Sequence, residues 1–230
     1  MESGPQGAPS YYGDLSRLKE RLLAMGGEAE QQVRNAIRAV AEPNAQLAEQ
    51  VLRGDRPIND LHLEIDERCL NILARQPREA GDLRVIVSGL KINGDLERIG
   101  DFAVNIAEAT LSYLRHPPVK PLIDIPTMGD IAQAMLRDAL NAYVRHDQGL
   151  ATGVLHRDDE VDALKDRVFR ELLQCMRDTP DLTTSALELI LVSRHIERVA
   201  DHATNIAEDV IFMISGRDIR HHAQEGVETG

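Results

Sequence analysis

The chain has 230 residues, with 26 Lys and Arg against 38 Asp and Glu, so its formal net charge is −12. This acidic balance argues against a nucleic-acid partner, because phosphate backbones are bound by basic surfaces. Aromatic residues make up only 3% of the chain and Trp is absent, whereas hydrophobic residues make up 43%. Since β-sandwiches and barrels draw on aromatic and β-branched residues, the composition favours a helical fold.

Features of the N-terminus and the cysteine content indicate the compartment. Residues 1–11 are polar and rich in Gly and Pro, which predicts a flexible segment and does not match a secretory signal. The chain has two cysteines, Cys69 and Cys175, which is too few for a disulfide framework or a zinc-binding cysteine cluster. No run reaches the roughly 18–20 apolar residues that span a bilayer. We therefore expect a cytoplasmic protein that is at most peripheral to a membrane.

Apolar residues recur at spacings of three and four through most of the chain, as in amphipathic helices. Helix-breaking residues separate these segments. Pro57, close to Gly54, further predicts a kink or break in the second segment. The predicted helices cover residues 12–42, 45–75, 79–115, 127–146, 149–177 and 181–215.

The chain also repeats itself. The sequence ERIGDFAVNIAE at 97–108 returns as ERVADHATNIAE at 197–208, with eight of twelve positions identical. About one identity would be expected by chance. Upstream of these segments the similarity continues at an offset of 103, so the two copies differ by three residues in a loop near 76–82.

Two units that each cover almost half of the chain indicate a duplicated domain, because a solenoid is built from a larger number of shorter repeats. Each unit contains three predicted helices, which short loops would join into an up-down-up bundle. The sequence therefore predicts an all-α fold of two tandem, pseudo-symmetric three-helix bundles. The first bundle covers 12–118 and the second 124–217, with a Pro-rich linker at 119–123 and a polar tail at 218–230.

Each copy places a row of oxygen-bearing side chains along its third helix, at i, i+4, i+8 and i+11. They are Glu97, Asp101, Asn105 and Glu108 in the first copy, and Glu197, Asp201, Asn205 and Glu208 in the second. Like charges one turn apart repel. A multivalent cation would offset this repulsion, and carboxylate and amide oxygens suit Mg²⁺, Mn²⁺, Ca²⁺ or iron.

The second helix of each unit adds a matching pair at i and i+4. Asp55 and Asn59 in the first unit align with Asp158 and Asp162 in the second. Neighbouring antiparallel helices would bring these side chains opposite the third-helix row. Because Asn59 is uncharged, we expect the first site to be less negative and to bind a multivalent ion more weakly. The alternative role for this pair is helix capping near the break at Pro57.

The alternative to metal binding is a pair of solvated faces, with Arg98 and Arg198 paired to carboxylates on neighbouring helices. His202, next to Asp201, is a further candidate ligand, although a place beside the site is favoured, and His195 is expected on a helix surface. The chain has no P-loop, dinucleotide fingerprint or G-x-S-x-G motif. We therefore expect a protein that is not an enzyme, and a metal-dependent phosphoesterase is a remote alternative.

The doubled motif resembles that of the PhoU family of phosphate-uptake regulators. The resemblance rests on LERIGD at 96–101 and IERVAD at 196–201, and on MGG at 25–27 and Gly54-Asp55. It covers about 14–216. Ala200 stands where the family has Gly in its second motif, and Asn59 stands where it has Asp.

The resemblance implies a fold of two pseudo-symmetric three-helix bundles whose E(D)-x-x-x-D motifs bind metal. Iron or zinc clusters occur in some family members, and Mg²⁺ or Mn²⁺ in others. Carried over by position, the ligands would be Glu97, Asp101, Glu197 and Asp201, supported by Asn105, Asn205, Asp55, Asp158 and Asp162.

The resemblance also implies a function. Members of the family regulate the phosphate-starvation response negatively, by coupling the ATPase component of a phosphate ABC transporter to a phosphate-sensing histidine kinase. Such proteins are cytoplasmic, peripheral to the membrane and often homodimeric. The alternative for this chain is a metal-free helical adaptor whose acidic faces dock a basic surface of a partner.

Overall fold

The computed structural model describes residues 11–75, 79–119 and 124–219, and within these ranges it contains helices and no strand. The predicted all-α class is therefore confirmed. Most of the predicted N-terminal segment, linker and tail lie outside the described residues. The helices are α1 (Tyr11–Ala41), α2 (Ala45–Arg53), α3 (Arg56–Ala74), α4 (Ala80–Tyr113), α5 (Asp124–Arg145), α6 (Gln148–Leu155), α7 (Asp158–Asp178) and α8 (Thr183–Ser215), with a short 3₁₀ turn, η1 (Pro180–Leu182), before α8.

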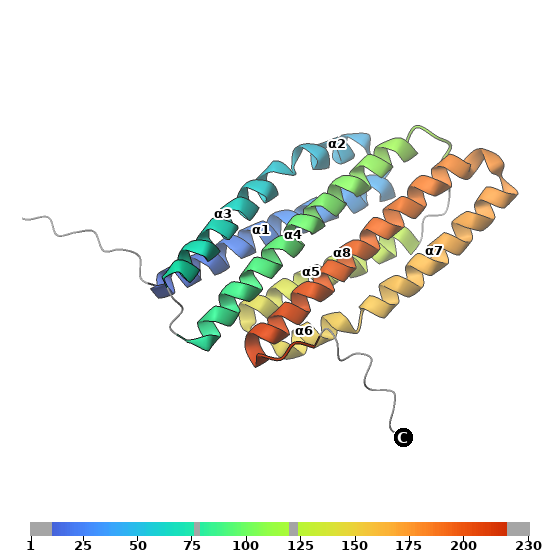
Figure 1. Ribbon diagram of the computed structural model, residues 1–230. Helices are drawn as coiled ribbons and strands as arrows, with labels where there is room; N and C mark the ends of the chain where they lie inside the picture. Colours follow the sequence, from blue (N-terminus) through green and yellow to red (C-terminus); the bar gives the residue numbers. More distant parts are fainter. Residues whose placement is uncertain (1–10, 76–78, 120–123, 220–230) are drawn as a thin grey trace, which may run out of the picture.

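The long helices lie side by side along one direction (Figure 1). In the first half, α2 and α3 follow one another and pack on α1 and α4, and in the second half α6 and α7 pack in the same way on α5 and α8. The two halves meet through α4 against α8 and α1 against α5, and the α4–α8 contact is the more extensive. This arrangement is the predicted pair of tandem bundles. None of the described helices is long and apolar enough to cross a membrane.

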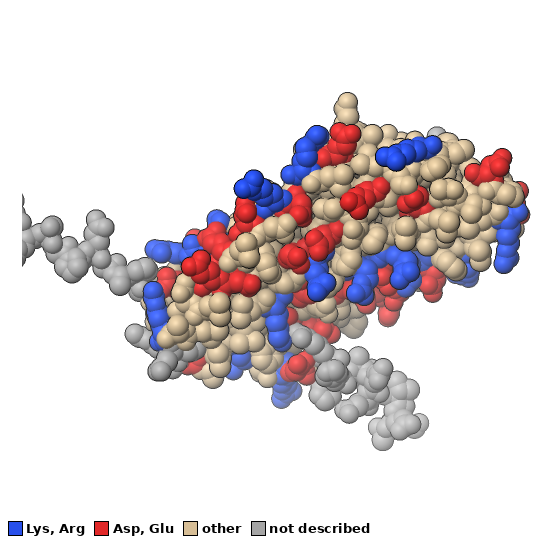
Figure 2. Space-filling view, turned by 45° about the horizontal axis from the view of Figure 1, so that its top comes forward, with Lys and Arg blue, Asp and Glu red and all other residues tan. Residues whose placement is uncertain are grey.

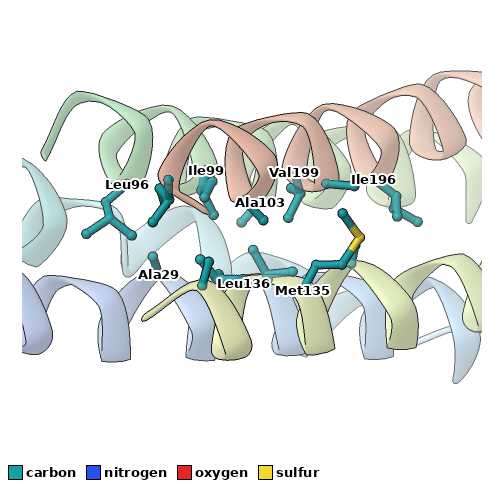
Figure 3. Close-up of a cluster of buried hydrophobic side chains, with 14 of the residues drawn as sticks. Ala29, Leu96, Ile99, Ala103, Met135, Leu136, Ile196 and Val199 are labelled. Atoms are coloured by element: carbon teal, nitrogen blue, oxygen red, sulfur yellow. The ribbon is translucent and has the colours of Figure 1, made fainter. Parts of the chain in front are cut away.

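The core of the protein runs through both halves. In Figure 3, apolar side chains of α4 and α8 point toward those of α1 and α5. Burying one Leu, Ile, Val or Met side chain contributes about 1.5–3 kcal/mol to the free energy of folding, so the shared layer stabilises both bundles together. The labelled side chains, which are fully buried, are Leu96, Ile99, Ala103, Ile196 and Val199 above, and Ala29, Met135 and Leu136 below.

The contact between α1 and α5 follows the internal repeat. Gly26 of α1 faces Leu140 of α5, and Gly129, its counterpart in the second half, faces Ile37 of α1. A Cβ added at Gly129 would lie 2.5 Å from Ile37 Cγ2, and one at Gly26 would lie 2.7 Å from Leu140 Cδ1. Both glycines therefore permit a close crossing in which each half inserts the same apolar position into the other.

The second helix of each half is broken in two, which confirms the break predicted within 45–75 and corrects the prediction of a continuous helix over 149–177. The first break coincides with the predicted one, since α2 ends at Arg53, directly before Gly54, and Pro57 lies in the first turn of α3. The side chain of Gln32 fills the space that a Cβ of Gly54 would need. The second break, at His156 and Arg157, has no Gly or Pro at its position and was not predicted.

Three successive carboxylates open α7 after this second break, at residues 158–160. Negative charge at a helix N-terminus is favourable because the free N–H groups and the helix dipole point there. The starts of α2 and α6 also correspond. The Asn44 side chain accepts a hydrogen bond from Leu47 N at 3.0 Å, and Asp147 accepts one from Leu150 N at 2.9 Å. The repeat is thus preserved down to the caps of its helices.

Candidate metal-binding faces

The first acidic face consists of Asp55 on the α2–α3 break and Glu97 and Asp101 on α4. Burial, followed by the charge of Asp55, raises the pKa of Asp101, and Arg98 opposes this shift. Asp55 precedes α3, but its side chain makes no capping hydrogen bond. It accepts a hydrogen bond from Asn59 Nδ2 at 2.5 Å instead. The structure therefore favours a role in the acidic face over the alternative of helix capping.

Packing between Ile58 and Gly100 holds the first face together. A Cβ added at Gly100 would lie 3.0 Å from Ile58 Cδ1, so the glycine of the doubled motif lets α3 approach α4 closely. At the equivalent positions of the second half, Val161 and Ala200 are both buried. Val161 is one carbon smaller than Ile58 and Ala200 is one carbon larger than Gly100. The repeat thus keeps the same number of side-chain carbons at these two positions in both halves.

The second acidic face consists of Asp158 and Asp162 on α7 and Glu197 and Asp201 on α8. Burial raises the pKa of Asp201, and the charges of Glu197 and Asp158 raise it further. The pKa of Asp158 is also raised, first by burial and then by the charge of Asp162. Thr204 of α8 donates a hydrogen bond to Asp158 across the two helices at 3.4 Å. The structure therefore brings together the carboxylates that the repeat predicted to be neighbours.

Lys165 lies within this second face and was not among the predicted site residues. Its Nζ atom is 2.8 Å from Asp162 Oδ1 on its own helix and 3.2 Å from Glu197 Oε1 on α8. These hydrogen bonds and charges raise its pKa despite partial burial. The signal in the sequence was its position one turn after Asp162. Because the ammonium offsets one carboxylate, the neutral Asn59 does not by itself make the first face the less negative one.

The arginines of the doubled motif agree only in part with the alternative of solvated faces. Arg198 Nη1 lies 2.9 Å from Asp201 Oδ2, on its own helix and not on a neighbouring one. Half of the Arg198 side chain is exposed, and such pairs contribute little to stability. Figure 2 shows acidic and basic residues intermixed over the face of the molecule that it presents.

The two predicted supporting asparagines lie away from the acidic faces, at the contact between α4 and α8. Asn205 Nδ2 donates a hydrogen bond to Asp95 Oδ1 on α4 at 3.4 Å. Asn105 lines a hollow of about 270 Å³ together with Glu108 and His195. A residue at i+8 is rotated by about 80° from residue i around a helix, which turns both asparagines toward the neighbouring long helix.

His195 and His202 of α8 lie at the same contact between α4 and α8. His202 Nδ1 is 2.7 Å from Asp95 Oδ1, and the ring is almost fully buried. The structure therefore places His202 beside the second acidic face, where it pairs with α4. His195, expected on a helix surface, is partly buried and stacks on Phe102 with ring centroids 5.9 Å apart.

The donor groups of both faces suit a hard cation, and the raised pKa values of Asp101, Asp158 and Asp201 show carboxylates that a cation would stabilise. Across residues 11–75, 79–119 and 124–219, no three His, Cys, Asp or Glu side chains are arranged to hold a metal ion. Metal binding would therefore require side-chain rotation. Glu97 and Asp101 with Asp55, and Glu197 and Asp201 with Asp158 and Asp162, are the residues that would hold it.

Comparisons with known proteins agree on one family. The sequence matches the PhoU domain twice, over residues 22–110 and 125–210. It is 39% identical to a phosphate-specific transport system accessory protein PhoU homolog of Pseudomonas putida, covering 92% of this chain and 83% of that protein. For a homolog from Aquifex aeolicus, the identity is 37%, over 92% and 96% of the two chains.

Two solved structures are similar as well. The crystal structure of PhoU from Pseudomonas aeruginosa superposes with a TM-score of 0.87 at 37% identity, and covers 90% of this chain and 100% of that one. The phosphate transport system regulatory protein PhoU from Streptococcus pneumoniae superposes with a TM-score of 0.85 at 26% identity, over 91% and 99% of the two chains. Since both halves match the domain and the relatives align along nearly the whole chain, the protein belongs to the PhoU family.

Proposed function

We propose that this protein is a metal-binding regulator of phosphate uptake that keeps the phosphate-starvation response off when phosphate is plentiful. It would act by coupling the ATPase component of a phosphate ABC transporter to a phosphate-sensing histidine kinase. We place it in the cytoplasm, at the membrane surface and as a homodimer. The observation that supports this proposal most strongly is family membership along nearly the whole chain, including relatives named as accessory to phosphate-specific transport.

The role in regulation is tested by complementation. A Pseudomonas strain that lacks its own homolog should express phosphate-starvation genes even in phosphate-rich medium. A plasmid carrying this chain should restore repression, measured as secreted phosphatase activity. Constitutive expression despite a normal level of the folded protein would contradict the proposal. Light scattering on the purified protein tests the homodimer, and copurification with the transporter ATPase and the kinase tests the partners.

The metal role is supported by the raised pKa values of Asp101 on the first face and of Asp158 and Asp201 on the second, which burial and then neighbouring carboxylates cause. Iron, zinc, manganese and magnesium are the candidate metals. Elemental analysis of protein purified without chelator should find a stoichiometric metal. A variant with Glu97→Ala, Asp101→Ala, Glu197→Ala and Asp201→Ala should lose it and remain helical by circular dichroism. Absence of metal in the original protein, with none taken up on addition, would contradict this role.

A second candidate is a metal-free adaptor whose acidic faces receive basic side chains of a partner. One observation favours it: the second face already holds an ammonium group, that of Lys165, between Asp162 and Glu197. This candidate predicts that binding to the transporter ATPase weakens with salt and is unchanged by chelators. The metal-binding regulator predicts that a chelator changes binding at constant salt.

A further inference from the structure

The two halves differ at one position that bears directly on the acidic faces. In the second half, Lys165 bridges α7 and α8 by contacting Asp162 and Glu197. The repeat aligns Lys165 with His62 in the first half. His62 turns toward Asp66 on its own helix, with Nε2 3.6 Å from Asp66 Oδ2. His62 therefore does not give the first face the bridge between helices that Lys165 gives the second.

The ammonium of Lys165 already contacts oxygens that a metal ion on the second face would bind. It hydrogen-bonds Asp162 of α7 and Glu197 of α8, and these two carboxylates belong to the group that surrounds Asp158 and Asp201. A metal ion binding the same oxygens would compete with the ammonium by charge and by space. In the first face, Asp55 accepts a hydrogen bond from the neutral amide of Asn59, which carries no charge to oppose a metal.

A groove next to Lys165 can accommodate its side chain after displacement. Its side chain is 26% exposed and lines a groove of about 630 Å³ between α7 and α8. Phe169, Ser193 and Arg194 line the same groove. A long flexible side chain can extend along such a groove while its charged end stays in water. Displacement of the ammonium therefore requires rotation of one side chain and no movement of either helix.

We propose that Lys165 is the resident counter-ion of the second acidic face and that metal binds there only by displacing it. The two faces are consequently unequal: the first takes up metal at lower concentration, and the second fills only when the Lys165 side chain has moved into the groove. This inference rests on the proposed metal role of the faces. It makes Lys165 a residue that sets the affinity of the second face and the order of filling.

The test measures Mn²⁺ binding to the full chain after removal of metals by a chelator. Free Mn²⁺ is measured by its electron paramagnetic resonance signal with two proteins whose first face is disabled by Glu97→Gln and Asp101→Asn. One of these proteins keeps Lys165, and the other also carries Lys165→Met. We expect Lys165→Met to tighten binding at the second face by about tenfold or more, which corresponds to about 1.4 kcal/mol. Lys19→Met is the matched control, because it removes the same charge from a lysine that donates to the Val144 carbonyl and contacts neither face.

Folding of every variant is checked by circular dichroism, and Lys165→Gln replaces Lys165→Met if the latter loses helicity. Equal Mn²⁺ affinity in the presence and absence of Lys165 would overturn this inference and leave metal binding itself standing. Equal tightening by Lys19→Met would also overturn it, since the effect would then come from total charge. The unmutated protein is titrated with Mn²⁺ in parallel, and failure of both the unmutated protein and every variant to bind Mn²⁺ would overturn this inference together with the metal role.

Discussion

The contact between Ile58 and Gly100 offers a sharp test of how the first acidic face is assembled. Gly100→Ala gains about 0.8–1.0 kcal/mol of helix propensity. The new Cβ would lie 3.0 Å from Ile58 Cδ1 and 3.3 Å from Cγ2, and such overpacking costs about 1–3 kcal/mol. We therefore expect Gly100→Ala alone to destabilise the protein by up to about 2 kcal/mol.

Ile58→Val removes the Cδ1 atom and leaves a small cavity, at a cost of about 0.5–1.5 kcal/mol. The double variant reproduces the residue types that the second half has at the equivalent positions, Val161 and Ala200. In it the added Cβ fills the cavity, so Gly100→Ala should cost about 1–2 kcal/mol less in the Ile58→Val background than in the wild type. We expect the double variant to be about as stable as the wild type.

Urea unfolding of the four proteins, followed by circular dichroism, measures this coupling as a double-mutant cycle. Independent sites add to within about 0.3–0.5 kcal/mol, so a coupling smaller than this would refute the reasoning. Gly94→Ala is a matched control on the same helix, because a Cβ there meets nothing within 4 Å. That variant should be stabilised through propensity alone, by the same amount in the wild type and in the Ile58→Val background.

Three further predictions concern stability. Gly129→Ala should lower the melting temperature because its Cβ would lie 2.5 Å from Ile37 Cγ2. Gly27→Ala should raise it, because a Cβ at that position meets no atom within 4 Å. A higher melting temperature in both variants would contradict the close crossing of α1 and α5. The pKa of Asp201 is raised, so its contribution to stability is fully present below its ordinary value and is lost as pH rises through the raised one. Asp201→Asn should therefore raise the melting temperature of metal-free protein more at pH about 7 than at pH about 4, and an equal rise at both would count against repulsion on the second face. The pKa of His195 is lowered, chiefly by burial, so its contribution to stability is present above its ordinary pKa and is lost as pH falls through the lowered pKa. Between pH about 7.5 and about 5, the melting temperature of His195→Gln should therefore fall less than that of the wild type. An identical dependence of melting temperature on pH in the two proteins would disprove this prediction.

The sequence alone determined the features that depend on local spacing and on the repeat. Helical periodicity and breakers predicted the long helices, and the duplication predicted two equivalent three-helix units. Asp55 and Asp158 were placed correctly opposite the third helices, because a repeated pattern on neighbouring helices must meet in the same way twice. Locally encoded caps, such as those of Asn44 and Asp147, belong to the same class.

Tertiary structure decided which groups each side chain meets across helices. Asn205 shares a helix with Glu197, but the drift of the helical period over two turns brings it to Asp95 of the other half. Lys165 is an ordinary charged position in the sequence, and only the packing of α7 on α8 places its ammonium against Glu197. Spacing along one helix specifies which side chains share a face, whereas contact between two helices depends on their separation and rotation, and these are set by buried side chains from the whole core.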